Sequence, residues 1–238
     1  MMTAARTFVV AALMAATPWT CSHADERIDL LLVLAADVSG SMDESKFDLQ
    51  RLGYASAFSD PRVMRAISAG ASRRIAVSFV EWSGIRQQKV VVDWEEISSA
   101  ETARAFGDRI MEASRAFTRN STSISAGIDF AVAQLNRAPY QARRRVIDVS
   151  GDGDNNSGRD VAAARDEAVG NGATINGLVI LTPGSLHSEH TNPPGGLASY
   201  YRDNVIGGPG AFVLAAESVN SFGNVLVKKL ITEIAQRR

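Results

Sequence analysis

Cysteine and histidine are scarce in this sequence, whose 238 residues include one cysteine, Cys21, and three histidines. A single cysteine excludes a disulfide framework, and it also excludes zinc and iron–sulfur sites that are built from cysteine ligands. Three histidines leave little room for a histidine-rich metal centre. The scarcity of both residue types therefore argues against thiol and imidazole clusters as the functional chemistry.

The sequence also lacks an excess of charge of one sign. Its 25 Lys and Arg residues nearly balance its 26 Asp and Glu residues, and the net charge is −1. Such a balance gives no reason to expect wholesale binding of nucleic acid or another polyanion. The hydrophobic fraction of 45% is too high for a disordered chain, and it is enough for one globular domain with a sizeable core.

Long apolar runs are absent as well. The stretch Phe8–Ala16 is too short to span a bilayer, but it follows a positive charge and precedes a small-residue cleavage motif that ends at Ala24, as in an export signal. We therefore expect a signal peptide over residues 1–24 and one domain over residues 25–238, exported to the periplasm or secreted. The alternatives are a lipid anchor at Cys21 and a buried N-terminal helix.

Segments with the pattern of buried strands alternate with helical segments along the rest of the chain. The nearly unbroken apolar run Ile28–Ala35 is typical of a strand that is covered on both faces. The alternation predicts an α/β fold of the Rossmann-like kind, with a doubly wound, mostly parallel sheet, one antiparallel edge strand and helices on both faces. Further strands are predicted at Ile75–Trp82, Lys89–Trp94, Val146–Ser150, Thr174–Leu181 and Phe212–Ala215, and helices at Asp43–Ser59, from a capping box in Ser98–Glu101 to about Ser114, at Ser125–Asn136, Gly158–Val169 and Ser218–Gln236.

A group of oxygen-bearing side chains follows the first predicted strand directly. In the motif Asp37-Val38-Ser39-Gly40-Ser41-Met42, side-chain oxygens recur at every second residue. This spacing allows Asp37, Ser39 and Ser41 to converge from one loop. One carboxylate and two hydroxyls suit a hard divalent cation such as Mg²⁺, Mn²⁺ or Ca²⁺. The alternative is that the two serines only cap the following helix.

A second carboxylate follows another predicted buried strand, at Asp152. The segment resembles the start of an EF-hand, but the turn glycine, Gly158, comes one place late and Ala163 stands where a bidentate Glu is required. In open α/β sheets, ligands bind at the carboxyl ends of the strands, where neighbouring strands send the chain to opposite faces. We therefore expect Asp152 to lie near Asp37, with Asp154 as the alternative carboxylate.

Together with Asn120–Ile128, these motifs make the sequence similar to the von Willebrand factor type A (VWA) domain superfamily, and within it to a group of exported bacterial proteins of unknown function. The resemblance covers nearly all of the chain after Arg27. It implies a metal-ion-dependent adhesion site (MIDAS), occupied most often by Mg²⁺, with Mn²⁺ or Ca²⁺ as alternatives. Gly151 departs from the hydroxyl residue that relatives often have there. The ligands that the resemblance implies are Asp37, Ser39, Ser41, Thr122 and Asp152.

This ligand set leads to a hypothesis about function. Only two of the five ligands carry charge, so a bound cation keeps residual positive character and can take an acidic side chain of a partner protein. We expect an exported, metal-dependent adhesion or scaffold module rather than an enzyme, with no membrane span and no nucleic-acid partner. The alternatives are a metal-assisted hydrolase of the cell envelope and a structural envelope component with a vestigial site.

Several residues have no assigned role at this level. His187 and His190 lie in a Pro/Gly-rich loop that is expected on the same rim as the metal; they are either solvated or a second metal site. Asp148 places a charge inside a central strand, where it either pairs with an arginine of Arg143–Arg145 or supports the metal site from behind.

The last predicted helix is expected to dock on the sheet through an apolar stripe. Lys228 and Lys229 are expected on its solvent side. The resemblance implies that this helix can move when the metal site is occupied. The stripe consists of Val219, Phe222, Leu226, Leu230 and Ile234.

Overall fold

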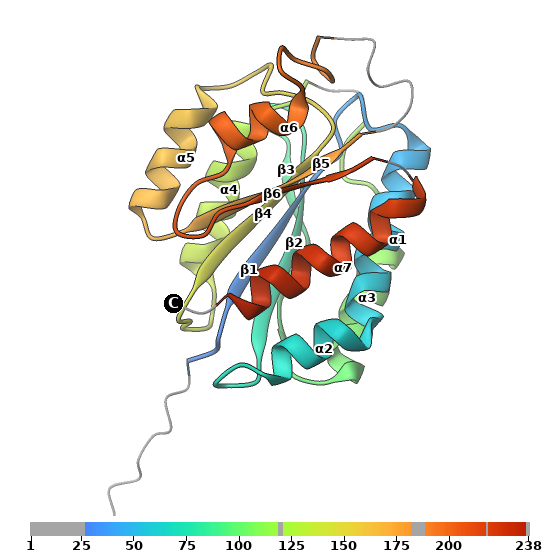
Figure 1. Cartoon of the computed structure of the whole chain (residues 1–238), viewed down its shortest axis with the longest axis vertical. Helices are drawn as coiled ribbons and strands as arrows, with labels where there is room; N and C mark the ends of the chain where they lie inside the picture. Colours follow the sequence, from blue (N-terminus) through green and yellow to red (C-terminus); the bar gives the residue numbers. More distant parts are fainter. Residues whose placement is uncertain (1–26, 119–120, 182–188, 218, 237–238) are drawn as a thin grey trace, which may run out of the picture.

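Six strands form one mixed sheet through the centre of the molecule (Figure 1). The computed structural model describes residues 27–118, 121–181, 189–217 and 219–236, so the predicted signal peptide and His187 lie outside the described residues. All neighbouring strands are parallel except the first two in spatial order, which are antiparallel. The spatial order is β3 (Gln88–Ile97), β2 (Ile75–Trp82), β1 (Leu31–Asp37), β4 (Arg145–Gly151), β5 (Thr174–Ile180) and β6 (Val213–Ala216).

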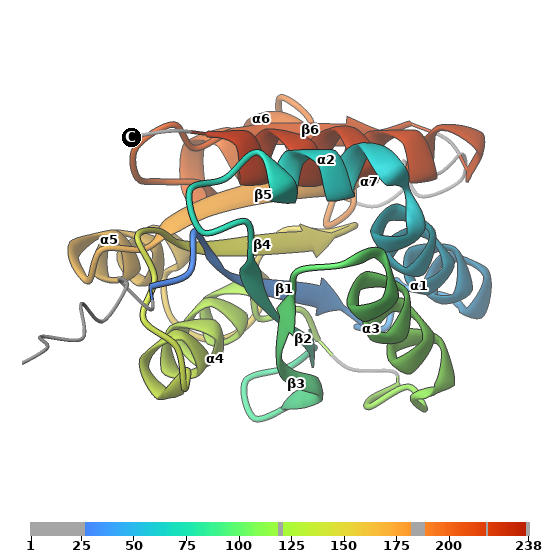
Figure 2. The same ribbon diagram turned by 90° about the horizontal axis from the view of Figure 1, so that it is seen from below.

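Helices cover both faces of this sheet, which confirms the predicted fold class (Figure 2). No helix within the described ranges combines the length and the hydrophobicity needed to cross a membrane. One face carries α1 (Glu44–Ser59), α2 (Pro61–Ser68), α3 (Ala100–Glu112) and α7 (Val219–Ala235); the other carries α4 (Ile124–Arg137), α5 (Val161–Gly170), α6 (Leu197–Tyr200) and the π-helix η2 (Tyr201–Val205).

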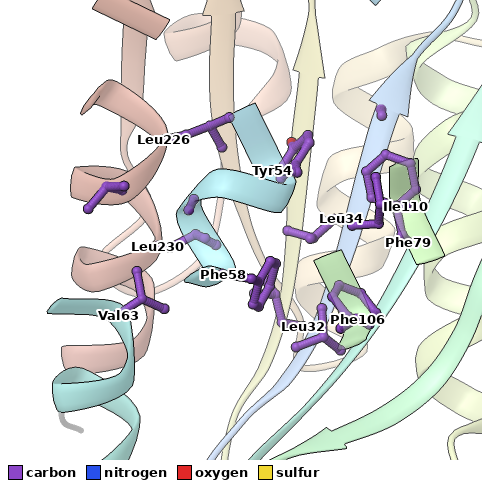
Figure 3. Close-up of a cluster of buried hydrophobic side chains, with 14 of the residues drawn as sticks. Leu32, Leu34, Tyr54, Phe58, Val63, Phe79, Phe106, Ile110, Leu226 and Leu230 are labelled. Atoms are coloured by element: carbon purple, nitrogen blue, oxygen red, sulfur yellow. The ribbon is translucent and has the colours of Figure 1, made fainter. Parts of the chain in front are cut away.

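Strand β1 supplies side chains to two separate hydrophobic clusters because successive residues of a strand point to opposite faces. Leu32 and Leu34 pack with Phe58 of α1 in the first cluster (Figure 3), whereas Val33 and Ala35 belong to the second. All seven residues of β1 are buried. Burial on both faces explains why this segment is apolar almost throughout rather than alternating.

Local hydrogen bonds explain where the helices begin, and the cap of α3 differs from the prediction. The capping box of α3 is formed by Ser99 and Thr102, not by Ser98 and Glu101, because β3 extends to Ile97 and shifts the helix start. In α1, Leu52 is exposed, and the buried face is formed by other residues, among them Tyr54 and Phe58.

The prediction that Lys229 faces solvent is wrong. Its side chain is fully buried, with Nζ 2.7 Å from Asp148 Oδ1 and in contact with Glu233 Oε1. Asn176 Nδ2 of β5 donates to the same Glu233 oxygen at 3.0 Å. Lys229 lies between Leu226 and Leu230 on α7, both of which pack on the sheet, so its helical phase directs it inward. The partner of Asp148 is therefore on α7 and not among the arginines of Arg143–Arg145.

The Asp148–Lys229–Glu233 triad places two carboxylates and one ammonium between β4 and α7. Burial raises the pKa of Asp148, and burial together with the charge of Asp148 raises the pKa of Glu233 from 4.5 to about 7. A carboxyl whose pKa is higher in the folded state stabilises the fold fully below its unfolded-state pKa, and this contribution is lost as the pH rises through the folded-state value. The charge of Lys229 lowers both pKa values, so the lysine favours the ionised form of the two carboxylates.

Replacing this lysine tests the triad. We expect Lys229→Met to lower the free energy of unfolding by about 3–5 kcal/mol, because it leaves two buried carboxylates without a cation. The loss should be smaller at about pH 5 than at about pH 8, since protonation removes the unpaired charge. Urea unfolding at both pH values measures it. The control is Lys228→Met, which removes an exposed lysine from the same helix turn; equal losses for the two variants would contradict the buried triad.

Candidate metal site

The predicted site lies where β1 and β4 end side by side. These strands are parallel neighbours, with Ala36 opposite Ser150. After β1 the chain passes to α1 on one face of the sheet, and after β4 it passes to α5 on the other face. A crevice opens in α/β sheets at such a point, because the two connections diverge. The sheet topology therefore places Asp37 and Asp152 at the position where ligands usually bind.

The structure brings all five predicted ligands together at this point. Ser41 Oγ lies 2.5 Å from Asp152 Oδ1 and 3.3 Å from Ser39 Oγ. Thr122 Oγ1, from the segment before α4, lies 3.0 Å from Ser39 Oγ. Asp37 Oδ1 accepts a hydrogen bond of 2.7 Å from the backbone N–H of Ser39. Three separate segments of the chain thus place two carboxylates and three hydroxyls close together.

The electrostatics of Asp37 fit a missing positive charge. Its side chain is fully buried, and within the described ranges Oδ2 has no hydrogen-bond partner. Burial and the neighbouring charge of Asp152 raise the pKa of Asp37 to about 7. A divalent cation would favour the ionised form of both carboxylates. The residues present therefore fit the cation that the sequence analysis predicts.

The donor set determines which cations suit the site. Across the described part of the chain, no cluster of three or more His, Cys, Asp and Glu side chains is placed to hold a metal. A cation between Asp37 and Asp152 would therefore depend on hydroxyl and water oxygens for the rest of its shell. Oxygen ligands of this kind suit Mg²⁺, Mn²⁺ and Ca²⁺.

Lys46 is a neighbour of the site that the sequence analysis did not identify. Its Nζ lies 2.6 Å from Asp152 Oδ2 and donates to the backbone oxygen of Ser41 at 2.9 Å. The residue stands in the first turn of α1, where its own N–H is capped by the Asp43 side chain. Lys46 therefore compensates one of the two carboxylate charges, and the described residues place no ion pair on the other.

Arg115 holds the loop that carries three of the predicted ligands, Asp37, Ser39 and Ser41. Its Nη2 approaches three backbone oxygens of this loop, at 2.9 Å from Val38, 3.2 Å from Ser39 and 2.6 Å from Met42. The guanidinium carbon also lies 4.9 Å from the centre of the Phe47 ring. The motif between β1 and α1 is thus tied to the segment after α3 by one side chain.

A buried ion pair fixes the segment that carries Arg115. Arg51 Nη2 of α1 lies 2.6 Å from Glu81 Oε1 of β2, and both side chains are nearly or fully buried. The other oxygen of Glu81 accepts a hydrogen bond of 2.7 Å from the N–H of Ala116. No local pattern in the sequence predicts this network, because its members come from α1, β2 and the segment after α3.

Asp152 and Asp154, the two alternatives for the second carboxylate, have different surroundings. Asp152 is fully buried beside Ser41, whereas Asp154 is partly exposed and contacts His190 Nδ1. The other ring nitrogen of His190, Nε2, lies 3.1 Å from Thr122 Oγ1. The sequence analysis expected the histidine loop on this rim, but it did not identify the contact with a predicted ligand.

Most of the chain matches the model of a known protein family. Residues 27–238 match the model of a family described as a protein of unknown function, DUF1194. No match was found among curated protein sequences.

Solved structures show the same fold at low sequence identity. The pilus adhesin SpaC from Lactobacillus rhamnosus GG is 14% identical with a TM-score of 0.60; the match covers 86% of this chain and 31% of that protein. A von Willebrand factor type A structure from Catenulispora acidiphila is 13% identical (TM-score 0.58, covering 89% and 44%). Proximal thread matrix protein 1 from the mussel byssus, with zinc occupying its MIDAS motif, is 14% identical (0.55, 88% and 49%).

These likenesses confirm the predicted resemblance to VWA domains at the level of the fold. In each comparison this chain spans less than half of the other protein's length. At such identities the likeness shows the fold alone, and the roles of individual residues here remain predictions.

Replacing Asp37 tests the cation site. Asp37→Asn keeps an acceptor for the N–H of Ser39 but removes one of two buried charges. We expect a higher unfolding midpoint than wild type in the presence of chelator, and no stabilisation by Mg²⁺. Wild type should gain about 2.7 kcal/mol at a Mg²⁺ concentration of about 100 times Kd. Thermal unfolding with chelator and with Mg²⁺ measures both effects, and the exposed Asp166→Asn should behave as wild type. Equal Mg²⁺ stabilisation of the Asp37 variant would exclude this residue as a ligand.

Replacing Arg115 tests the support of the loop. Arg115→Lys keeps the charge but loses the guanidinium group, whose Nη2 reaches three carbonyls. We expect Mg²⁺ affinity to fall by about tenfold or more, as for other groups that orient metal ligands. Calorimetric titration measures the affinity, and Arg137→Lys, in an exposed pair with Asp93, is the control. If both variants retain wild-type affinity, the loop does not depend on Arg115.

Proposed function

We propose that this chain, which belongs to the DUF1194 family of proteins of unknown function, is an exported protein-binding module that captures an acidic group of a partner through a divalent cation. One observation carries the proposal. Five oxygen-bearing side chains from three segments meet at the switch point of the sheet, and only two of them are charged.

The charge balance at this point favours an anionic partner. Asp37 and Asp152 contribute two negative charges, and Lys46 contributes one positive charge at 2.6 Å from Asp152. A divalent cation there would supply a coordination position for a carboxylate oxygen, and the assembly of cation, carboxylates and lysine would carry a net positive charge. Ser39, Ser41 and Thr122 are neutral and add no charge that would oppose the partner.

The named neighbours support a binding role rather than catalysis. SpaC is a pilus adhesin, and the mussel protein is a matrix protein whose MIDAS motif holds zinc in one structure. By analogy we assign adhesion or scaffolding to this chain, with Mg²⁺ as the first choice of cation and Mn²⁺ or Ca²⁺ as alternatives.

Export is part of the same proposal. We assign residues 1–24 to a signal peptide and residues 25–238 to a single VWA-like domain in the periplasm or outside the cell. N-terminal sequencing of the protein recovered from the envelope fraction should begin at Asp25. A chain that still begins at Met1 would contradict this processing.

The test of function is capture of a partner from the envelope fraction by the immobilised protein. We expect proteins to be retained with Mg²⁺, released by chelator, and absent when Asp37→Asn is the bait. Blocking the carboxyl groups of the envelope proteins with a carbodiimide and an amine should abolish retention, because the partner's carboxylate is then an amide.

The exposed Asp166→Asn variant serves as the matched bait, and it should retain the same proteins as wild type. Retention that survives chelator, or that is unaffected by carboxyl blocking, would contradict capture of an acidic group through a cation.

A second candidate function is metal-assisted hydrolysis, which one contact favours. His190 is oriented by Asp154 and lies beside Thr122, so it is a general-base candidate next to the cation site. Mg²⁺-dependent turnover of generic ester or phosphate substrates that is lost in His190→Ala would support this candidate. No turnover by wild type leaves the binding role.

A further inference from the structure

We propose that His190, held by Asp154, is part of the cation site and positions Thr122 by accepting a hydrogen bond from its hydroxyl group. This inference rests on the proposed function, because it adds two residues to the same site. The predicted ligand set contains neither of them, and the sequence analysis left His190 between a solvated loop residue and a second metal site.

The hydroxyl group of Thr122 lies between two possible hydrogen-bond partners. Its side chain is almost fully buried, and Oγ1 has two polar side-chain neighbours, Ser39 Oγ at 3.0 Å and His190 Nε2 at 3.1 Å. A hydroxyl has one proton and two lone pairs. Without a cation, Thr122 Oγ1 donates to Ser39 Oγ. With a cation bound, both hydroxyls would direct lone pairs to it, and the Thr122 proton would turn away from the positive charge to the other neighbour. The His190 nitrogen stands in that position.

The contact with Asp154 decides which ring nitrogen of His190 carries the proton. A carboxylate only accepts hydrogen bonds, so in the neutral ring the contact of Asp154 with Nδ1 places the single ring proton on Nδ1. Nε2 then carries a lone pair and accepts from Thr122. This orientation follows from the two contacts together, because each involves a different nitrogen of the same ring.

Backbone hydrogen bonds from the segment after β4 bring Thr122 and His190 together. The N–H of Asp154 donates to the backbone oxygen of His190 at 2.9 Å. Asn156 Oδ1 accepts from the N–H of Thr122 at 2.9 Å, and the N–H of Asn156 donates back to the Thr122 carbonyl at 3.0 Å. The segment that follows β4 therefore fixes Thr122 on one side and His190 on the other.

Gly153 provides the space for the ring. A Cβ atom at this position would lie 2.3 Å from His190 Nε2, closer than real Cβ contacts. Gly153 is not among the glycines with positive φ, so its backbone conformation is open to other residues. Glycine is therefore required at position 153 because the imidazole ring leaves no room for a side chain there.

Hydrogen bonds of this kind, made to a metal ligand by a group behind it, typically change metal affinity by about 10–100-fold when they are removed. The experiment is a double-mutant cycle on the full chain, with Kd for Mg²⁺ and Mn²⁺ measured by calorimetry. The variants are His190→Ala, Thr122→Val and the two combined. We expect His190→Ala to weaken binding by about tenfold, and to have no further effect once the Thr122 hydroxyl is absent.

Two more variants sharpen the cycle. Asp154→Ala should weaken binding in the same direction and add nothing to His190→Ala, since it acts through the ring. Glu189→Ala changes the exposed neighbour of His190 and should leave Kd at the wild-type value. Unfolding midpoints measured in chelator show whether each variant remains folded.

The outcomes separate this inference from the proposed function. Unchanged Kd in His190→Ala, with binding still lost in Asp37→Asn, overturns the role of His190 and leaves the cation site intact. Losses that add in the double variant show that His190 does not act through Thr122, and this result also overturns the inference. Absence of Mg²⁺ and Mn²⁺ binding by wild type removes both proposals.

Discussion

The repulsion between two buried carboxylates is the constraint on which the functional end of this molecule depends. Asp37 and Asp152 stand at the ends of neighbouring strands, where the topology of the sheet brings them together. Lys46 compensates one charge, and Asp37 Oδ2 is buried without a hydrogen-bond partner in the part of the chain that the structure describes. The fold therefore maintains an electrostatic cost at this point, and a divalent cation is the ligand that would relieve it. The proposed capture of a partner rests on the same balance, because a cation held by so few charged ligands would attract another carboxylate.

The same strand, β4, carries a second buried carboxylate whose charge is balanced within the chain. Asp148 points to the face covered by α7, where Lys229 and Glu233 complete a buried triad. Asp148 in the middle of β4 and Asp152 just after its end thus differ in the origin of the compensating charge. At Asp148 this charge lies within the chain, and at Asp152 the proposed cation would add to Lys46. Displacement of α7 along the sheet would separate the triad, so the position of this helix is tied to the central strand by charge as well as by apolar packing.

Around the site, groups that are not predicted ligands hold those that are. Arg115 ties the loop of Asp37–Met42 to the segment after α3, and Asp154 orients His190 toward Thr122. Such support matters because hydroxyl ligands are weak donors that bind a cation only when their lone pairs already face it. The ligand motif therefore describes the centre of the site, and the contacts around it determine how well the centre is preorganised.

Sequence patterns alone determined the fold class, the segments of most strands and helices, and the meeting of Asp37, Ser39 and Ser41 with Asp152 at the ends of β1 and β4. The resemblance to VWA domains added Thr122. These features are readable because apolar periodicity and the spacing of oxygen-bearing residues are local properties of the chain. Only the tertiary structure decided the partners of the charges. Lys46 meets Asp152 across 106 residues, and Thr122 meets His190 across 68. Lys229 is buried because of the rotation of α7 about its own axis relative to β4. The apolar stripe of the helix fixes this rotation only to within one residue position. A charge acquires its pKa and its partner from the elements that pack across from it, and that information is absent from its own segment.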